Sequence, residues 1–201
     1  MTQYRLLLRP EVMQQLSALK RAADTQQPGG LRDREFRALW LGLRALANGQ
    51  EESFNGKRLG YGSHDLSDCA EIKLPVIPES RGNQELGPSH RLLYREFEPE
   101  DGGPPYREVI AFEPRKEDRP FDIAATRLGR DRGERHSALP MPTPTSPAAP
   151  TRQPLPPDLR IALAAASNVA SARGATTIPT AAASHPPASV SRNDRPPSLT
   201  K

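Results

Sequence analysis

Three basic residues stand on separate strand-like segments in the middle of the chain. They are Lys73 in DCAEIKL (68–74), Arg91 in SHRLLYREF (89–97) and Arg115, which follows YREVIAF (106–112). If the three segments pair as neighbouring strands, these side chains can meet on one surface. Ammonium and guanidinium groups bind anions, and the planar fork of arginine holds two phosphate oxygens at once. The sequence therefore predicts a phosphate-sized anion site.

Helical patterns before these segments indicate the layer that must position them. Residues 4–9 are typical of a first strand, and Pro10 suits the first turn of a helix. Apolar residues recur at helical spacing after Pro10 and again over about 31–48, where Asn48 and Gly49 favour a helix end. Two adjacent amphipathic helices predict a helical hairpin that packs on a sheet.

The strand segments separate an apolar face from a charged one. In the first segment Ala70, Ile72 and Leu74 fall on one face, and Glu71 and Lys73 fall on the other. The next segment alternates in the same way.

A last helix is expected after Arg115, with Asp118 as its N-cap and Pro120 in its first turn. The order is then β-α-α-β-β-β-α, with strands linked as hairpins. This order predicts an α+β domain, in which a helical hairpin packs on a small, mostly antiparallel sheet and the helices lie on one face.

Aromatic residues divide the chain into two parts. All ten lie between Tyr4 and Phe121, whereas residues 131–201 contain none of them and 13 of the 23 prolines. Such a segment cannot bury enough apolar surface to offset its ordering entropy. We therefore expect one folded domain over 1–130 and a Pro/Ala-rich disordered tail over 131–201, in which 158–173 could form a transient helix.

The net charge of +4 comes from the tail. Residues 1–130 contain 20 basic and 20 acidic residues, and residues 131–201 contain 8 and 4. The high pI is therefore no evidence for nucleic-acid binding by the domain, which would need a local basic patch.

Cysteine usage and hydropathy exclude further classes. Cys69 is the only cysteine, so an intrachain disulfide and a cysteine-based zinc site are excluded. The N-terminus is not typical of a signal peptide, and no apolar stretch approaches membrane-spanning length. We expect a cytoplasmic protein without membrane contact and without a metal site.

The domain resembles the RelE/ParE toxin superfamily of bacterial type II toxin–antitoxin systems, on its RelE-like branch. The resemblance rests on the order of the elements, on DCAEIKL followed by HRLLYRE, and on the Arg115–Lys116 pair before the last helix. It covers about residues 1–130. The superfamily fold, a helical hairpin on a curved and mainly antiparallel sheet, agrees with the elements expected here.

The resemblance implies a metal-independent endoribonuclease that cleaves messenger RNA, usually on the ribosome. The ribose 2′-hydroxyl attacks the adjacent phosphate, so a base must accept its proton and cations must stabilise the added negative charge. Lys73, Arg91 and Arg115 match the basic residues of RelE-like sites. No cofactor is implied, and the implied partners are mRNA, the ribosome and a cognate antitoxin.

Five more residues complete the implied site. Glu71 stands where the best-known members carry a second basic residue and could accept a proton, and His90 could act as an acid or base. Phe121 stands where they carry a tyrosine, six residues beyond the arginine, and could stack on a base. Arg95 and Lys116 are the remaining candidates for contact with RNA.

Ordinary structural roles are the alternative for all of these residues. Glu71 and Lys73 could pair with cross-strand charges, and Arg91 and Arg95 could be solvated strand residues. Arg115 and Lys116 lie among three acidic residues and could belong to a surface ion-pair network. Phe121 could be a core residue, and His90 an ordinary residue at a strand end.

Two other functions remain open. A ParE-like inhibitor of DNA gyrase shares the fold and needs none of the RNA-cleaving residues. A non-catalytic binding protein on the toxin fold would account for the neutral domain and for Glu71 and Phe121.

Overall fold

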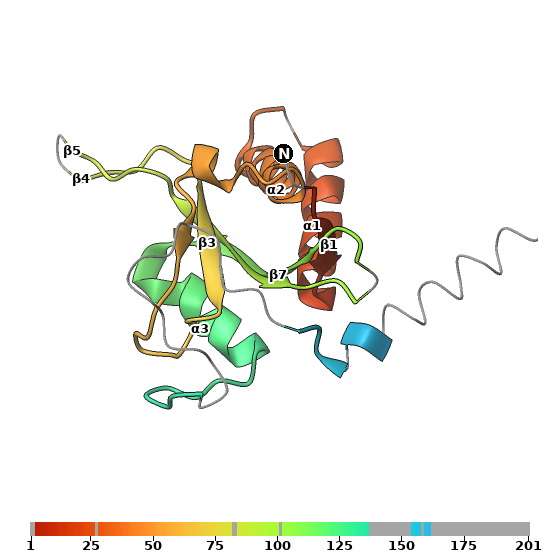
Figure 1. Cartoon of the computed structure of the whole chain (residues 1–201). Coiled ribbons are helices and arrows are strands. Elements are labelled where there is room, and N and C mark those ends of the chain that lie inside the picture. The colour runs from red at the N-terminus through yellow and green to blue at the C-terminus, as the bar shows by residue number, and fades with distance from the viewer. Residues whose placement is uncertain are drawn as a thin grey trace, which may run out of the picture. The chain divides into compact units, whose positions relative to one another are not determined.

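The computed structural model describes residues 3–26, 28–81, 84–100, 102–136, 154–157 and 159–161. The predicted α+β fold and the order β-α-α-β-β-β-α are confirmed, with short elements added between the expected ones (Figure 1). In chain order the elements are β1 (Arg5–Leu8), α1 (Pro10–Thr25), α2 (Leu31–Ala47), η1 (Glu51–Phe54), β2 (Lys57–Arg58), β3 (Cys69–Leu74), β4 (Ser80–Arg81), β5 (Gln84–Glu85), β6 (His90–Phe97), β7 (Tyr106–Pro114), η2 (Lys116–Asp118) and α3 (Arg119–Arg127).

The main sheet has five strands in the order β1-β7-β6-β3-β2. Only β1 and β7 run parallel, and the other neighbours are antiparallel. A bulge interrupts the β6–β7 ladder, where Leu93 pairs with Ala111 and Tyr94 pairs with Val109, so Ile110 has no opposite residue. This central β3–β6–β7 ladder carries the three segments that the sequence singled out.

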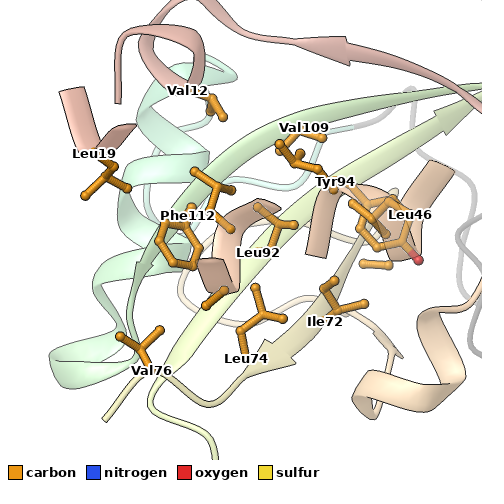
Figure 2. Packing of buried hydrophobic residues seen from close by; sticks show 14 residues of the cluster. Val12, Leu19, Leu46, Ile72, Leu74, Val76, Leu92, Tyr94, Val109 and Phe112 are labelled. Carbon is orange, nitrogen blue, oxygen red and sulfur yellow. The ribbon is translucent and has the colours of Figure 1, made fainter. Parts of the chain in front are cut away.

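The helical hairpin of α1 and α2 covers one face of the sheet and encloses the larger core (Figure 2). Side chains from both helices meet the inward residues of three strands there: Val12, Leu19, Leu39, Leu46, Ile72, Leu74, Leu92, Tyr94, Val109 and Phe112. Helix α2 comes closest to the sheet at Gly42, where an added Cβ would lie 2.8 Å from Leu74 Cδ1 and 3.0 Å from Leu92 Cδ2. The glycine therefore permits the close approach of helix and sheet.

Helix α3 packs on the opposite face, so the expectation that the helices lie on one face is wrong (Figure 1). Ala124 and Ala125 of α3 lie in a second apolar cluster with Cys69, Leu93 and Ile110. The small side chains let α3 lie close to this face. The residues of β6 and β7 that point away from the hairpin therefore lie on the α3 side of the sheet.

The tail expected over 131–201 lies mostly outside the described residues, as does most of the helix expected over 158–173. The chain forms two units, Met1–Pro157 and Asp158–Lys201. In the first unit, the backbone N–H of His136 donates to Asp65 Oδ2 at 3.1 Å, and Leu155 is buried. Residues beyond 130 therefore also make contacts within this unit.

Neither a membrane-spanning helix nor a metal site is found in the described part of the chain. No helix there combines the length and the apolar character that crossing a membrane requires, and no group of three or more His, Cys, Asp or Glu side chains there is arranged to hold a metal ion.

Candidate anion-binding site

Lys73 and Arg91 lie directly opposite each other on the β3–β6 pair. Both alternate with residues that face the helical hairpin, so both lie on the face that α3 covers. Arg91 Nε lies 3.2 Å from Glu71 Oε2, and Lys73 Nζ lies 3.9 Å from Glu71 Oε1. Two cations from neighbouring strands therefore share one buried carboxylate.

Arg91 is held more rigidly than Lys73. Its Nη1 donates to the carbonyl oxygens of Pro88 and His90 at 2.8 and 3.0 Å, and its side chain is 12% exposed. Burial lowers the pKa of Arg91 and the charge of Glu71 opposes this shift, yet an arginine stays protonated in proteins. The Lys73 side chain is 28% exposed. Arg91 is thus a fixed cation beside a more accessible one.

Arg115 joins the same group from the end of β7. Its backbone N–H donates to the carbonyl of Ser89, which places it beside the start of β6. Its Nε donates to Glu79 Oε2 at 3.0 Å, and both Arg115 and Glu79 act electrostatically on Arg91. We refer to Lys73, Arg91 and Arg115 as the cation cluster.

Every member of the cation cluster already has a carboxylate partner. Glu71 serves Lys73 and Arg91, and Glu79 serves Arg115. The same three residues therefore fit both interpretations from the sequence, anion binding and ion pairing. An anion that binds here must compete with these two carboxylates, which favours a ligand with several negative oxygens.

Glu113 and Arg119 extend the cluster towards α3 and were not predicted from the sequence. Glu113 is the β7 partner of Arg91, and its Oε2 lies 3.1 Å from Arg119 Nε. Burial raises the pKa of Glu113, although the charges of Arg119 and Arg127 oppose the shift. The sequence did contain a signal for Glu113. It stands two residues before Arg115, and strand residues two apart share a face.

The backbone between Arg115 and α3 is strained. Glu117 and Asp118 are consecutive residues with positive φ, at 58° and 54°. Left-handed backbone at residues other than glycine costs roughly 1–2 kcal/mol each. Asp118 occupies the N-cap position of α3, as predicted, but its side chain makes no cap hydrogen bond. These two residues form the turn between Arg115 and α3. Strained backbone of this kind is often found at functional sites.

His90 lies on the other face of the sheet, so the structure does not bring it to the cation cluster. Its ring is buried and stacks on Phe112 within the hairpin core. Ser89 Oγ accepts the N–H groups of Val76 and Ile77, so its hydroxyl proton is left for His90 Nδ1 at 3.0 Å. Burial lowers the pKa of His90, although the charges of Glu35 and Glu79 oppose the shift. A neutral His90 thus anchors the segment that carries Glu79.

Arg95 lies on the α3 face but is occupied in an ion-pair layer. Its Nε donates to Glu108 Oε2 at 2.9 Å, and its Nη1 lies 3.6 Å from Asp68 Oδ2. Arg9 from the end of β1 binds the other oxygen of Glu108 at 2.8 Å. The Arg95 side chain is only 13% exposed, so the solvated alternative does not describe it, and it offers little surface for contact with RNA.

Lys116 and Phe121 differ in their accessibility. Lys116 is almost fully exposed, with Nζ 3.6 Å from Glu117 Oε1. Phe121 is partly buried against the α3 cluster and also lines a pocket of about 270 Å³, whose other lining residues are Leu59, Gly60, Tyr61, Gly62, Ser63, His64, Leu66 and Asp118. Phe121 thus packs in the second apolar cluster and also lines a pocket.

No match was found when the chain was compared with known protein families, with curated proteins and with solved structures. The fold and the site define a small α+β protein in which Lys73 and Arg91 share Glu71 on the α3 face of the sheet, and Arg115, paired with Glu79, follows the neighbouring strand.

Proposed function

We propose that this protein is the toxin of a toxin–antitoxin pair and that it cleaves translated mRNA without a metal ion. The observation that carries the proposal is the meeting of Lys73 and Arg91 at Glu71 on adjacent strands, with Arg115 beside them. The order of the elements and the antiparallel β7-β6-β3 ladder support the resemblance to the RelE/ParE superfamily as a whole.

The proposed reaction assigns a role to each charged group. Arg91 and Arg115 hold the non-bridging oxygens of the scissile phosphate and stabilise the added negative charge. Glu71 accepts the proton of the attacking 2′-hydroxyl. Lys73, the more accessible cation, stabilises the 5′-oxygen leaving group. The partners of this proposal are mRNA, the ribosome and a cognate antitoxin that blocks the charged face.

Induced expression in a bacterial host tests the proposal. The native chain should arrest translation and leave transcripts cut at defined positions, whereas Lys73→Ala, Arg91→Ala and Arg115→Ala should each abolish both effects. Arg132→Ala, a change of an exposed arginine after α3, is the matched control and should remain toxic. Full toxicity of all three cluster variants would refute the assignment.

A cleavage assay separates the chemistry from toxicity. An RNA with one 2′-deoxy nucleotide at the cleavage position should resist the protein, because the attacking hydroxyl is missing. Cleavage of the unmodified RNA should continue in excess EDTA. Cleavage of the deoxy substrate, or its loss in EDTA, would contradict the proposed reaction.

A non-catalytic binding protein on the same fold is the second candidate. The pairing of every cluster cation with Glu71 or Glu79 favours it, because a fully compensated cluster can be a structural ion-pair network. This candidate predicts intact transcripts and normal growth after induction of the native chain.

A further inference from the structure

Helix α2 presents an exposed stripe that combines aromatic, aliphatic and cationic side chains. Its members are Leu31, Arg34, Arg37, Trp40, Leu41 and Arg44, all exposed. With about 100° of rotation per residue, the five residues from Arg34 to Arg44 fall on one side of the helix, and Leu31 lies at its edge, half a turn around the axis from Trp40. From Leu31 to Arg44, a span of fourteen residues, the stripe runs for about 20 Å. The opposite side of α2 packs closely on the sheet at Gly42. We refer to these six residues as the α2 stripe.

The apolar members of the α2 stripe are unusually accessible for their size. Trp40 is 52% exposed, Leu41 50% and Leu31 44%. A single exposed apolar residue needs no explanation, but Trp40 and Leu41 are neighbours, and together they form a surface that gains free energy when covered. Trp40 is also the only tryptophan of the chain. Tryptophan and arginine are the residues that most often dominate the energy of protein–protein contacts.

The charge of the α2 stripe has one sign. Arg37 pairs with the buried Asp33 at 2.9 Å and remains 70% exposed. Within the described part of the chain, neither Arg34 nor Arg44 has an ion-pair partner. Glu35, the other acidic residue of this helix, is buried and lies near His90 on the sheet side. A partner of the stripe would therefore meet positive charge along its length.

We propose that the α2 stripe docks an acidic amphipathic helix of another protein. An apolar ridge on that helix would cover Trp40 and Leu41, and flanking Asp or Glu side chains would pair with the arginines. Charge complementarity fixes the acidic sign of the partner. Half-exposed leucines gain nothing from phosphates, which favours a protein partner over a nucleic acid. The stripe and the cation cluster lie on opposite faces of the sheet, so the inference goes beyond the proposed function.

Trp40 itself supplies the measurement, because its fluorescence is the only tryptophan signal of the chain. Three probes are added to the full chain: a synthetic helical peptide with Leu at i, i+3, i+4 and i+7 and Glu elsewhere, a scrambled peptide of the same composition, and oligouridylate. We expect a saturable blue shift of Trp40 with the amphipathic peptide alone. Docking through the arginines also requires that the affinity fall as salt is added.

Charge reversal identifies the surface that binds. Arg34→Glu combined with Arg44→Glu should weaken peptide binding about tenfold or more, because two attractive contacts become repulsive. Arg132→Glu combined with Arg135→Glu makes the same charge change beyond α3 and should leave the affinity within about twofold. All four residues are exposed, although Arg135 stacks on Tyr61, and circular dichroism verifies that the variants keep the fold.

Three results would overturn the docking proposal. They are the absence of a Trp40 shift up to about 1 mM peptide, an equal response to the scrambled peptide, and a response to oligouridylate but not to the amphipathic peptide. The last result would assign the stripe to nucleic acid. The same titration on the Lys73→Ala chain should be unchanged, so a failure of the proposed RNA cleavage does not decide the outcome here.

Discussion

Arg115 donates a hydrogen bond of 3.0 Å to Glu79, a residue of the segment that links β3 to β6. The two side chains are 29% and 25% exposed, so the pair lies at the rim of the cation cluster. Glu79 occupies one of the guanidinium N–H groups that would hold a phosphate. The linking segment thus sets the strength of the anion site, although none of its residues belongs to the strands that form the site.

Neutralising Glu79 should therefore strengthen anion binding. We expect Glu79→Gln to bind inorganic pyrophosphate roughly 1.5- to 5-fold more tightly, the free-energy range of a partly exposed ion pair. Calorimetric titration at low salt measures the change. Glu85→Gln, on the same segment, removes an equal charge from an exposed residue and should have a smaller effect. Equal effects of the two variants would show that only net charge matters.

Arg107 is a buried arginine whose removal should lower the free energy of unfolding strongly. It is fully buried, its Nη atoms donate to both oxygens of Glu51 at 3.0 and 2.8 Å, and its Nε donates to Glu96 at 3.2 Å. Breaking a buried pair leaves an uncompensated charge and costs about 3–5 kcal/mol. Urea unfolding of Arg107→Ala should show this loss.

Arg37→Ala provides the comparison for Arg107. It removes one partner of an ion pair in which the arginine is mostly exposed, and it should lower the free energy of unfolding by less than about 1 kcal/mol. Similar losses for the two variants would contradict a structural role for the buried Arg107 pairs.

The arrangement of the strands could be read from the sequence because one face of each strand is apolar. Ile72 and Leu92 face the hairpin core, so Lys73 and Arg91 must share the opposite face. The same parity rule places His90 with Leu92, on the hairpin side. Had the rule been applied to His90, it would have removed this residue from the candidate site.

The buried charges could not be read from the sequence. Arg107 lies 56 residues from Glu51, and Arg130 lies 62 residues from Asp68. Charged residues in an alternating pattern normally indicate solvent, and only the fold reveals which carboxylate reaches which guanidinium. Glu79 was missed for a related reason, since its place in a long connection gave no sign of contact with Arg115.

Glu113 should make the stability of the protein depend on pH in a defined direction. Burial raises its pKa above the usual 4.5, so the folded state favours the protonated carboxyl. Its contribution to the free energy of unfolding is then fully present below the unfolded pKa and is lost as pH rises through the folded pKa. Glu113→Gln should therefore gain stability relative to the native chain as the pH rises from the usual 4.5 through the raised pKa of the folded state.

Urea unfolding at several pH values measures the Glu113 effect. Glu117→Gln, at an exposed position, should follow the native pH profile. A Glu113→Gln curve parallel to that of the native chain would show that Glu113 titrates normally.

Glu117 offers a direct test of the backbone strain beside the cation cluster. Its φ of 58° suits glycine, and its exposed side chain lies 3.6 Å from Lys116 in an ion pair that contributes little. Glu117→Gly should raise the free energy of unfolding by roughly 0.5–1 kcal/mol, because relief of the left-handed strain exceeds the added entropy of the unfolded chain. Glu117→Ala removes the same charge but keeps the Cβ, so it should give no such gain in urea unfolding. Equal stabilisation by both variants would attribute the effect to charge rather than to the backbone.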